Sequence, residues 1–395
     1  MLPWQLTPER FEAGQITLWD RVENSIGCAR GDSFGSHVIM RTASYSLRMV
    51  VFVIAGVVFG GRVTAESPSA KLWPSAFQTG SFHWVVGPPI VAARESTAEV
   101  TYFSIKDPSV VRFEDRWHLF CTVRGKPRTH QVEYLILRDW KDEQPRREFL
   151  KITDGYYCAP QVFYFRPHKK WYLIYQTSDP SRKPALQPAF STNERLDDVE
   201  GWSPPSFLFP TGPEGVQRWI DFWIICDEER AYLFFTSLDG QFWRSETPLK
   251  DFPHGWSQPR VVLRADIFEA AHVYRLKGLP LYLAIIEAQN GSRRYYKAYL
   301  ADRLDGEWRA LAAERDKPFL GPQNVTFRGE PWCESFSHGE LIREGIDERM
   351  EVNPDRLEML FQGVSDQEMR GKVYGEIPWR LGLAVQQLPM IRERK

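Results

Sequence analysis

Three carboxylates, Asp107, Asp221 and Glu269, each stand at the start of a run of strand-forming residues. Hydrolysis of a glycosidic bond needs such groups, because one carboxylic acid protonates the leaving oxygen while a second carboxylate activates water or attacks the sugar. A third carboxylate nearby can raise the pKa of the acid by like-charge repulsion. A lone aspartate at a strand end usually only caps a turn. The sequence therefore indicates glycosidase chemistry if the fold brings the three side chains together.

The neighbours of each carboxylate predict its role. Asp107 follows Lys106, whose cation favours the ionised carboxylate, so we predict that Asp107 is the general base. Glu269 lies in the apolar stretch of residues 268–271, where burial favours the protonated form, so we predict that it is the general acid. Asp221 then remains as the group that modulates the pKa of the acid.

The elements that must position these side chains form a five-fold repeat. Each unit consists of two short β-runs joined by a polar turn, and the units start about 50 to 70 residues apart, the size of a four-stranded propeller blade. The units open with KDPSVV at Lys106, CAPQVF at Cys158, DFWIIC at Asp221, FEAAHVY at Phe268 and SHGEL at Ser337. A radial array brings the inner ends of its blades together at the axis. We therefore predict an all-β, five-bladed propeller with the carboxylates at its centre and at one common strand position.

The rest of the mature chain also has the pattern of short strands. Turn-forming Gly, Pro, Asn and Asp residues separate runs rich in Val, Ile, Phe, Tyr and Trp, and no long amphipathic helix competes with them. No linker divides these runs, so we predict one catalytic domain over residues 66–395, with a short lead-in from Glu66 to Trp84. The tail GEIPWRLGLAV from Gly375 is predicted to be a final strand that closes the ring against the first blade, because closure removes exposed strand edges.

The N-terminal part has the layout of a secretory signal. The apolar segment MVVFVIAGVVFGG from Met49 follows two arginines and precedes a small-x-small ending, Val63-Thr64-Ala65. We predict that residues 40–65 are a signal peptide that starts at Met40, and that residues 1–39 come from a start site placed too early or are disordered. The alternative is a cytoplasmic extension before a single anchor helix. In the favoured interpretation the protein is secreted or periplasmic.

The composition limits the kinds of molecule that the protein is expected to bind. The formal net charge of −1 does not favour nucleic acid or an anionic membrane surface. The 15 Trp and 25 Phe suit either sugar stacking or packing between blades. No CxxC or Cys/His metal spacing, P-loop, HExxH or GxSxG motif occurs, and the sequence leaves open whether the widely spaced cysteines are paired or free thiols.

Taken in order, the segments IKDPSVV, YYCAPQVFYFRPHKKWYLIYQ, WIDFWIICDEERAYLFF, IFEAAHVYRLKGLPLYLAIIEA, RRYYKAY and SHGEL resemble the α-L-arabinofuranosidases of glycoside hydrolase family 62. The resemblance implies a five-bladed propeller that removes arabinofuranosyl side chains from arabinoxylan or arabinan with inversion. It gives the same roles as above: Asp107 the base, Asp221 the modulator and Glu269 the acid. Lys106 and Arg294 would line the arabinose pocket.

The resemblance also implies a metal and leaves room for other activities. His338 matches a family histidine beside a central calcium ion that is otherwise mostly hydrated; no organic cofactor is expected. Thr177 stands where the family usually has a tryptophan that packs on the xylan backbone. The alternatives are another five-bladed glycosidase, of the β-xylosidase or arabinanase type, and a non-catalytic carbohydrate-binding propeller. We expect a monomer.

Overall fold

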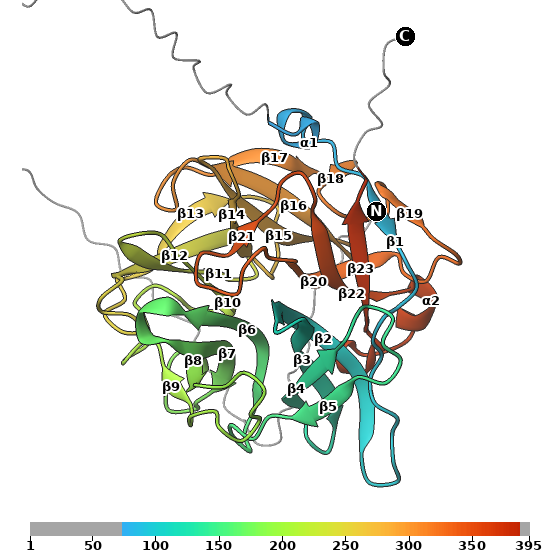
Figure 1. Cartoon of the computed structure of the whole chain (residues 1–395), viewed down its shortest axis with the longest axis horizontal. Helices are drawn as coiled ribbons and strands as arrows, with labels where there is room; N and C mark the ends of the chain where they lie inside the picture. The colour runs from blue at the N-terminus through green and yellow to red at the C-terminus, as the bar shows by residue number, and fades with distance from the viewer. Residues whose placement is uncertain (1–72, 388–395) are drawn as a thin grey trace, which may run out of the picture. The chain divides into compact units, whose positions relative to one another are not determined.

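The computed structural model describes residues 73–387. These residues form one compact unit built from five sheets arranged around a common centre (Figure 1). The predicted all-β, five-bladed propeller is thereby confirmed. The predicted N-terminal extension 1–39 and signal peptide 40–65 lie outside the described residues. No helix within residues 73–387 is long and apolar enough to cross a membrane.

The first three blades are four-stranded antiparallel sheets whose strands follow one another in the chain. Blade 1 consists of β2 (Thr101–Phe113), β3 (Arg116–Lys126), β4 (His130–Leu137) and β5 (Arg146–Phe149); blade 2 of β6 (Tyr157–Phe165), β7 (Lys170–Ser178), β8 (Leu186–Asn193) and β9 (Ser206–Phe207); blade 3 of β10 (Ile220–Cys226), β11 (Arg230–Thr236), β12 (Gln241–Pro248) and β13 (Arg260–Arg264). Each predicted pair of β-runs supplies the two innermost strands of its blade.

The last two blades contain additional strands. Blade 4 consists of β14 (His272–Leu276), β15 (Tyr282–Asn290), β16 (Arg293–Ala301), β17 (Arg309–Glu314), β18 (Lys317–Pro318) and β21 (Glu351–Val352); blade 5 of β20 (Ser335–Leu341), β22 (Glu358–Val364), β23 (Arg380–Gln386), β1 (Trp84–Val86) and β19 (Val325–Phe327). The described helices are short: α1 (Ser75–Thr79), η1 (Arg166–His168), α2 (Asp366–Met369) and η2 (Tyr374–Glu376).

The ring is closed within blade 5. The predicted tail strand exists as β23, which pairs with β22 and with the N-terminal strand β1. It also lies against the first blade, as predicted, because the carbonyl of Trp379, directly before β23, accepts the N–H of Ile105 of β2 at 3.2 Å. Strand β1 comes from the end of the predicted lead-in. Its Trp84 is fully buried and donates its indole N–H to the carbonyl of Phe319 in blade 4. The two ends of the propeller chain are therefore joined in a single sheet.

Replacing Trp84 by Ala is expected to lower the free energy of unfolding by about 3–5 kcal/mol, because it empties a buried site of tryptophan size in the closing blade. Chemical denaturation followed by fluorescence and circular dichroism measures the change. The matched control is Trp73→Ala, since the side chain of Trp73 is 38% exposed and its loss leaves no cavity. Equal stability of the two variants would contradict a role of β1 in closing the ring.

A bulge interrupts the inner edge of each blade, and it sets the direction of the side chains at the axis. In the first four blades, a non-glycine residue adopts a left-handed conformation there, with φ of 47° at Asp107, 50° at Ala159, 57° at Asp221 and 48° at Ala270. The pairing register also shifts between Ser337 and Gly339 in blade 5. Such residues are strained unless their surroundings hold them, and they concentrate at functional sites.

The bulges correct one part of the sequence prediction. Asp107 and Asp221 occupy the same place in their blades, but in blade 4 that place belongs to Ala270, so Glu269 lies one residue earlier. The residue that corresponds to Glu269 in blade 1 is Lys106. The three carboxylates therefore do not share a single strand position, although all three lie at the bulges.

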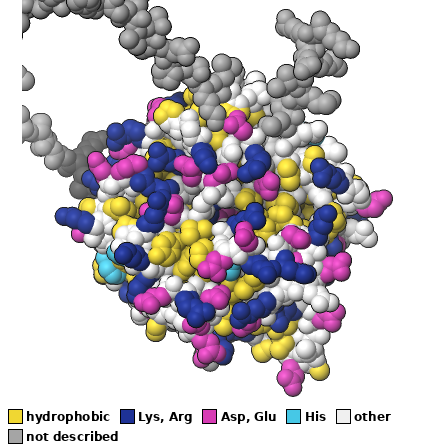
Figure 2. Space-filling model, in the orientation of Figure 1, with side chains coloured by type: hydrophobic (Ala, Val, Ile, Leu, Met, Phe, Trp, Pro, Cys, Tyr) yellow, Lys and Arg dark blue, Asp and Glu magenta, His cyan; other side chains and the backbone are white. Residues whose placement is uncertain are grey.

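Among the described residues the four cysteines, Cys121, Cys158, Cys226 and Cys333, are all free and buried. The sequence left open whether they are paired in disulfides or free, and in the structure they are free thiols. On the face seen in Figure 2, positive and negative side chains are interspersed rather than gathered by sign.

Candidate active site

Hydrogen bonds between neighbouring blades hold the bulges. A bulge leaves a backbone N–H without a partner in the sheet, and burial requires that such a group be satisfied. In each case a side chain from the preceding blade accepts it: Gln362 Oε1 from Asp107 N (2.8 Å), Thr122 Oγ1 from Ala159 N (2.9 Å), Gln176 Oε1 from Asp221 N (3.3 Å), Asp221 Oδ2 from Ala270 N (2.9 Å) and Glu287 Oε2 from His338 N (2.8 Å). We call these five contacts the interblade hydrogen bonds. They tie the strained residues of the axis into one ring.

One of the interblade hydrogen bonds differs from the rest. Thr122, Gln176, Glu287 and Gln362 all stand on the second strand of their blades, opposite the residue that precedes the bulge. Thr236 has this place in blade 3, but its buried hydroxyl has no hydrogen-bond partner among residues 73–387. The carboxylate of Asp221 takes over the contact and binds the N–H of the residue next to Glu269. Asp221 is thus held by the structure beside Glu269.

The structure brings the predicted base and modulator together. His338 lies between them, with Nδ1 3.4 Å from Asp107 Oδ1 and 3.7 Å from Asp221 Oδ2. The ammonium of Lys106 is 4.0 Å from Asp107 Oδ1. Both carboxylates are deeply recessed, since the side chain of Asp107 is 9% exposed and that of Asp221 is 5% exposed. Lys106, Asp107, Asp221 and His338 therefore belong to one site, as predicted.

The same site moves the two aspartate pKa values in opposite directions. Burial acts to raise the pKa of Asp107, but the charges of Lys106 and His338 and a hydrogen bond with Thr122 outweigh it and lower that pKa. Burial raises the pKa of Asp221 well above its usual range, and the charges of Glu269 and Asp107 raise it further. Opposite shifts in neighbouring carboxyls are typical of sites that separate acid and base roles. The lowered pKa of Asp107 favours its ionised form, and the raised pKa of Asp221 favours its protonated form.

Glu269 lies against Arg294. The guanidinium Nη1 of Arg294 is 3.7 Å from Glu269 Oε1, and the same guanidinium packs 4.2 Å from the ring centroid of Phe268. The prediction that Glu269 has apolar surroundings is therefore wrong, because β16 places the guanidinium of Arg294 beside it. The side chain of Glu269 is 12% exposed, more than that of Asp221, so it is the better placed of the two to reach a leaving oxygen.

Several residues of the site were missed by the sequence analysis. Glu287 is fully buried and lies 3.3 Å from Arg294 Nη1 through its Oε1. Tyr374, which is 37% exposed, accepts a hydrogen bond of 3.4 Å from Lys106 Nζ. Gln176 and Gln362 orient the backbones of the two aspartates. For Gln176, Glu287 and Gln362 the sequence did contain a signal. Each is a polar residue that directly follows three aromatic or apolar residues on the second strand of its blade.

The donor set around His338 gives little support to a directly bound metal. Within residues 73–387 there is no group of three or more His, Cys, Asp or Glu side chains that could hold a metal ion. One ring nitrogen of His338 already faces two carboxylates. Calcium prefers six to eight oxygen ligands, so an ion here would have to be carried mostly by water. The chemistry derived below uses only the side chains.

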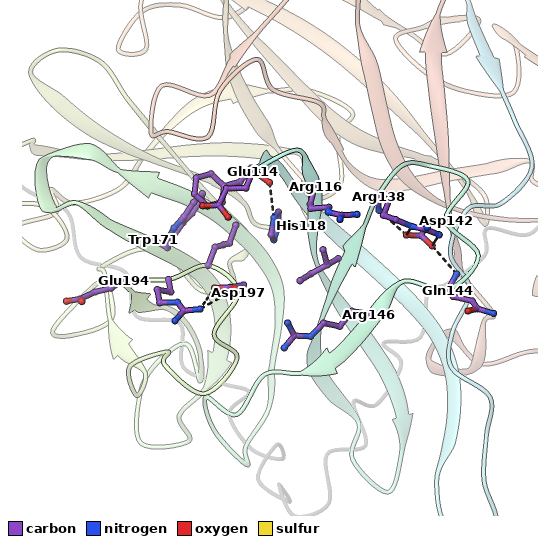
Figure 3. A pocket seen from close by; sticks show the side chains of 14 residues that line it. Glu114, Arg116, His118, Arg138, Asp142, Gln144, Arg146, Trp171, Glu194 and Asp197 are labelled. Carbon is purple, nitrogen blue, oxygen red and sulfur yellow. Dashed lines mark hydrogen bonds and ion pairs between the residues drawn. The ribbon is translucent and has the colours of Figure 1, made fainter.

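A separate groove of about 680 Å³ lies away from these residues (Figure 3). It is lined by Phe113 at the end of β2 and by residues after β8, roughly 20 Å along the strand from Asp107 at the usual rise per residue. Two ion pairs join residues of its lining, Arg138 with Asp142 at 3.1 Å and Arg195 with Asp197 at 3.3 Å. None of the predicted site residues lines this groove.

A five-bladed propeller with three recessed carboxyls at its axis, one of them kept ionised by a lysine, defines a glycoside hydrolase. The comparisons with known proteins agree. The model of glycosyl hydrolase family 62 matches residues 97–385, and the chain belongs to this family.

Two kinds of relative support this assignment. The chain is 38% identical over 290 residues to α-L-arabinofuranosidase C of Cellvibrio japonicus, a match that covers 71% of this chain and 44% of that protein. The chain thus spans less than half the length of this curated relative. Among solved structures, the catalytic domain of a family 62 α-L-arabinofuranosidase from Coprinopsis cinerea has a TM-score of 0.72 at 34% identity, covering 78% of this chain and 98% of that one. The α-L-arabinofuranosidase of Podospora anserina, solved with cellotriose, has the same TM-score and coverages at 32% identity.

Proposed function

We propose that this protein is an exo-acting, inverting α-L-arabinofuranosidase that removes arabinofuranosyl side chains from arabinoxylan or arabinan. The observation that carries the proposal is the pair of oppositely perturbed aspartates beside Glu269 and Arg294. The side chains of the three carboxyls are at most 12% exposed, and such a recess suits a single terminal sugar better than the middle of a polymer. Membership of family 62 and the names of the relatives support arabinofuranose as that sugar.

In the proposed mechanism, Asp107 accepts a proton from a water molecule that attacks the anomeric carbon, while Glu269 donates a proton to the leaving oxygen. Lys106 keeps Asp107 ionised. Asp221 fixes the backbone beside Glu269 by accepting the N–H of Ala270. Arg294 Nη1 faces Glu287 and Glu269, and the exposed 9% of this side chain is what the proposal assigns to a sugar hydroxyl.

The proposal names two candidate polymers, arabinoxylan and arabinan. A family 62 hydrolase solved with xylotriose resembles this chain at 32% identity and a TM-score of 0.72, which favours a xylan backbone. Thr177, however, is buried and donates its hydroxyl to the carbonyl of Tyr156, so it offers no flat surface to a sugar ring. Tyr374 is an exposed aromatic residue near the pocket that can supply one instead.

The test is incubation with arabinoxylan and with branched arabinan, with arabinose and its anomeric form followed by NMR. Release of arabinose as the β-anomer first would establish activity, substrate and inversion together. Release of xylose or of arabinan fragments would support the β-xylosidase or arabinanase alternative. Sugar binding without any product would support a carbohydrate-binding propeller.

We also propose export through the segment at residues 40–65, a monomeric state, and no nucleic-acid or membrane partner after cleavage. The apolar segment from Met49 and the near-zero net charge support these points. N-terminal sequencing of the exported protein and its mass by light scattering measure the first two. A mature protein that retains Met1 would overturn the signal-peptide assignment.

A calcium ion beside His338, held mostly through its own waters, is proposed as well. Because few protein ligands are available, removal of calcium by a chelator is expected to lower the melting temperature by only a few degrees and to leave hydrolysis detectable. Thermal melting with and without added calcium measures the shift. The control is His338→Gln, in which calcium should no longer change the melting temperature; the same calcium shift in both proteins would place the ion elsewhere.

A further inference from the structure

Glu287 is a buried carboxyl that the mechanism above does not use. It follows the apolar run LAII on β15 and is fully buried. Its Oε2 accepts hydrogen bonds of 2.8 Å from both Ser337 Oγ and His338 N, and its Oε1 faces Arg294. Burial of a carboxyl is costly unless it has partners such as these. The contacts of Glu287 therefore reach both the substrate-binding side and the ring of bulges.

From Glu287 the contacts continue to the general base. Ser337 Oγ, which donates to Glu287, accepts a hydrogen bond of 3.1 Å from Gln362 Nε2. The other end of the Gln362 amide accepts the backbone N–H of Asp107 at 2.8 Å. We call Glu287, Ser337 and Gln362 the positioning network. It is a continuous chain from Arg294 in blade 4, through blade 5, to Asp107 in blade 1.

We propose that the positioning network is a catalytic support for the function proposed above: Gln362 fixes the general base, and Glu287 fixes Arg294 for the substrate. Asp107 has a left-handed backbone with φ of 47°, which persists only where the surroundings hold it. Gln362 is the group that binds its N–H. Misplacing a catalytic group by about 1 Å can cost roughly 100-fold in rate.

At the other end, Arg294 has two acidic neighbours. Its Nη1 is 3.3 Å from Glu287 Oε1 and 3.7 Å from Glu269 Oε1. Glu287 is the nearer of the two and is itself fixed by Ser337 and His338. Without it, the acidic neighbour left to Arg294 at this distance is Glu269, so the guanidinium would turn toward the general acid and away from the sugar.

We expect different kinetic effects from substitutions at the Asp107 end and at the Arg294 end of the positioning network. Gln362→Met keeps the size of the side chain and removes its hydrogen bonds, so kcat for arabinofuranoside hydrolysis is expected to fall roughly 100-fold while KM changes less than about twofold. Glu287→Gln replaces one acceptor oxygen by an amide nitrogen, which cannot accept from Ser337 and His338 or face Arg294 as the carboxyl does, so KM is expected to rise roughly tenfold. Ser337→Ala removes one hydroxyl from the middle of the network and is expected to cost several-fold in rate without preventing folding.

Matched controls exist for both ends. Gln161 is also fully buried and also bridges two blades through its amide, but its partner is Ile224, with Oε1 accepting from the N–H at 2.7 Å. Glu340 is a fully buried carboxyl that pairs with Arg343 at 2.8 Å. Gln161→Met and Glu340→Gln should affect thermal stability like the network variants, but kcat and KM should stay within about twofold of the parent.

The experiment measures kcat and KM for all five variants and the parent on 4-nitrophenyl α-L-arabinofuranoside, with the melting temperature of each. Site occupancy by arabinose, measured by calorimetry, corrects for any unfolded fraction. If the parent is active and the network variants behave like their controls, the positioning network is structural and this inference is overturned. If the Gln362 variant does not fold, Ser337→Ala with unchanged kinetics overturns it equally. An inactive parent overturns the proposed function itself.

Discussion

Asp107→Asn is expected to lower kcat roughly 100- to 10,000-fold, the usual contribution of a general base. An amide of the same shape cannot take a proton from the attacking water, and it also leaves Lys106 without its carboxylate partner 4.0 Å away. Every turnover needs the water whatever group leaves. The loss should therefore be similar on 4-nitrophenyl α-L-arabinofuranoside and on arabinoxylan.

Initial rates on the two substrates measure this effect. The control is Asp115→Asn, because Asp115 follows the same strand and its side chain is 99% exposed. It should retain full activity. If Asp107→Asn kept more than about a tenth of the parental rate, the general base would have to be another group of the site.

Glu269→Gln is expected to show a loss that depends on the leaving group. On arabinoxylan or branched arabinan the leaving sugar needs a proton, so kcat should fall roughly 100- to 10,000-fold. On 4-nitrophenyl α-L-arabinofuranoside the leaving phenolate needs little help, so the loss should be much smaller. The ratio of the two rates is thus a signature of the acid that does not depend on the amount of folded protein.

Parallel assays of the two substrates give this ratio, with Glu307→Gln as a control on an exposed glutamate. An equal loss on both substrates would show that Glu269 is not the acid. Asp221 would then be the candidate, since its pKa is raised and it lies beside Glu269.

The fold was predictable because strand pairs repeat along the chain with a blade-sized spacing. Local patterns do not show where the ring closes, however. Strand β1 has only three residues, Trp84–Val86, too few to stand out, and its partners Val325–Phe327 and Arg380–Gln386 lie far along the sequence. The register of Glu269 was missed for a related reason, since a bulge inserts a residue without changing the residue types around it.

The site was predictable where chemistry follows from adjacent residues and not where it follows from neighbouring strands. Lys106 precedes Asp107 in the chain, and their pairing was predicted correctly. Arg294 reaches Glu269 across the hairpin of β15 and β16, so the apolar sequence around Glu269 gave the wrong environment. Glu287 acts on the next blade, and only the closed ring shows its partners.

The interblade hydrogen bonds have a consequence for the folding of the enzyme during its synthesis. The bond from Asp107 to Gln362 joins residues 255 positions apart, and β23, which flanks Gln362, is the last described strand. A nascent chain that already contains Asp107, Asp221 and Glu269, but not yet Gln362, therefore lacks the contact that positions Asp107 as the proposed base. A chain from which a protease has removed β23 lacks the strand that flanks Gln362. We therefore expect activity to appear only after β22 and β23 have joined the ring, and to be lost when β23 is removed.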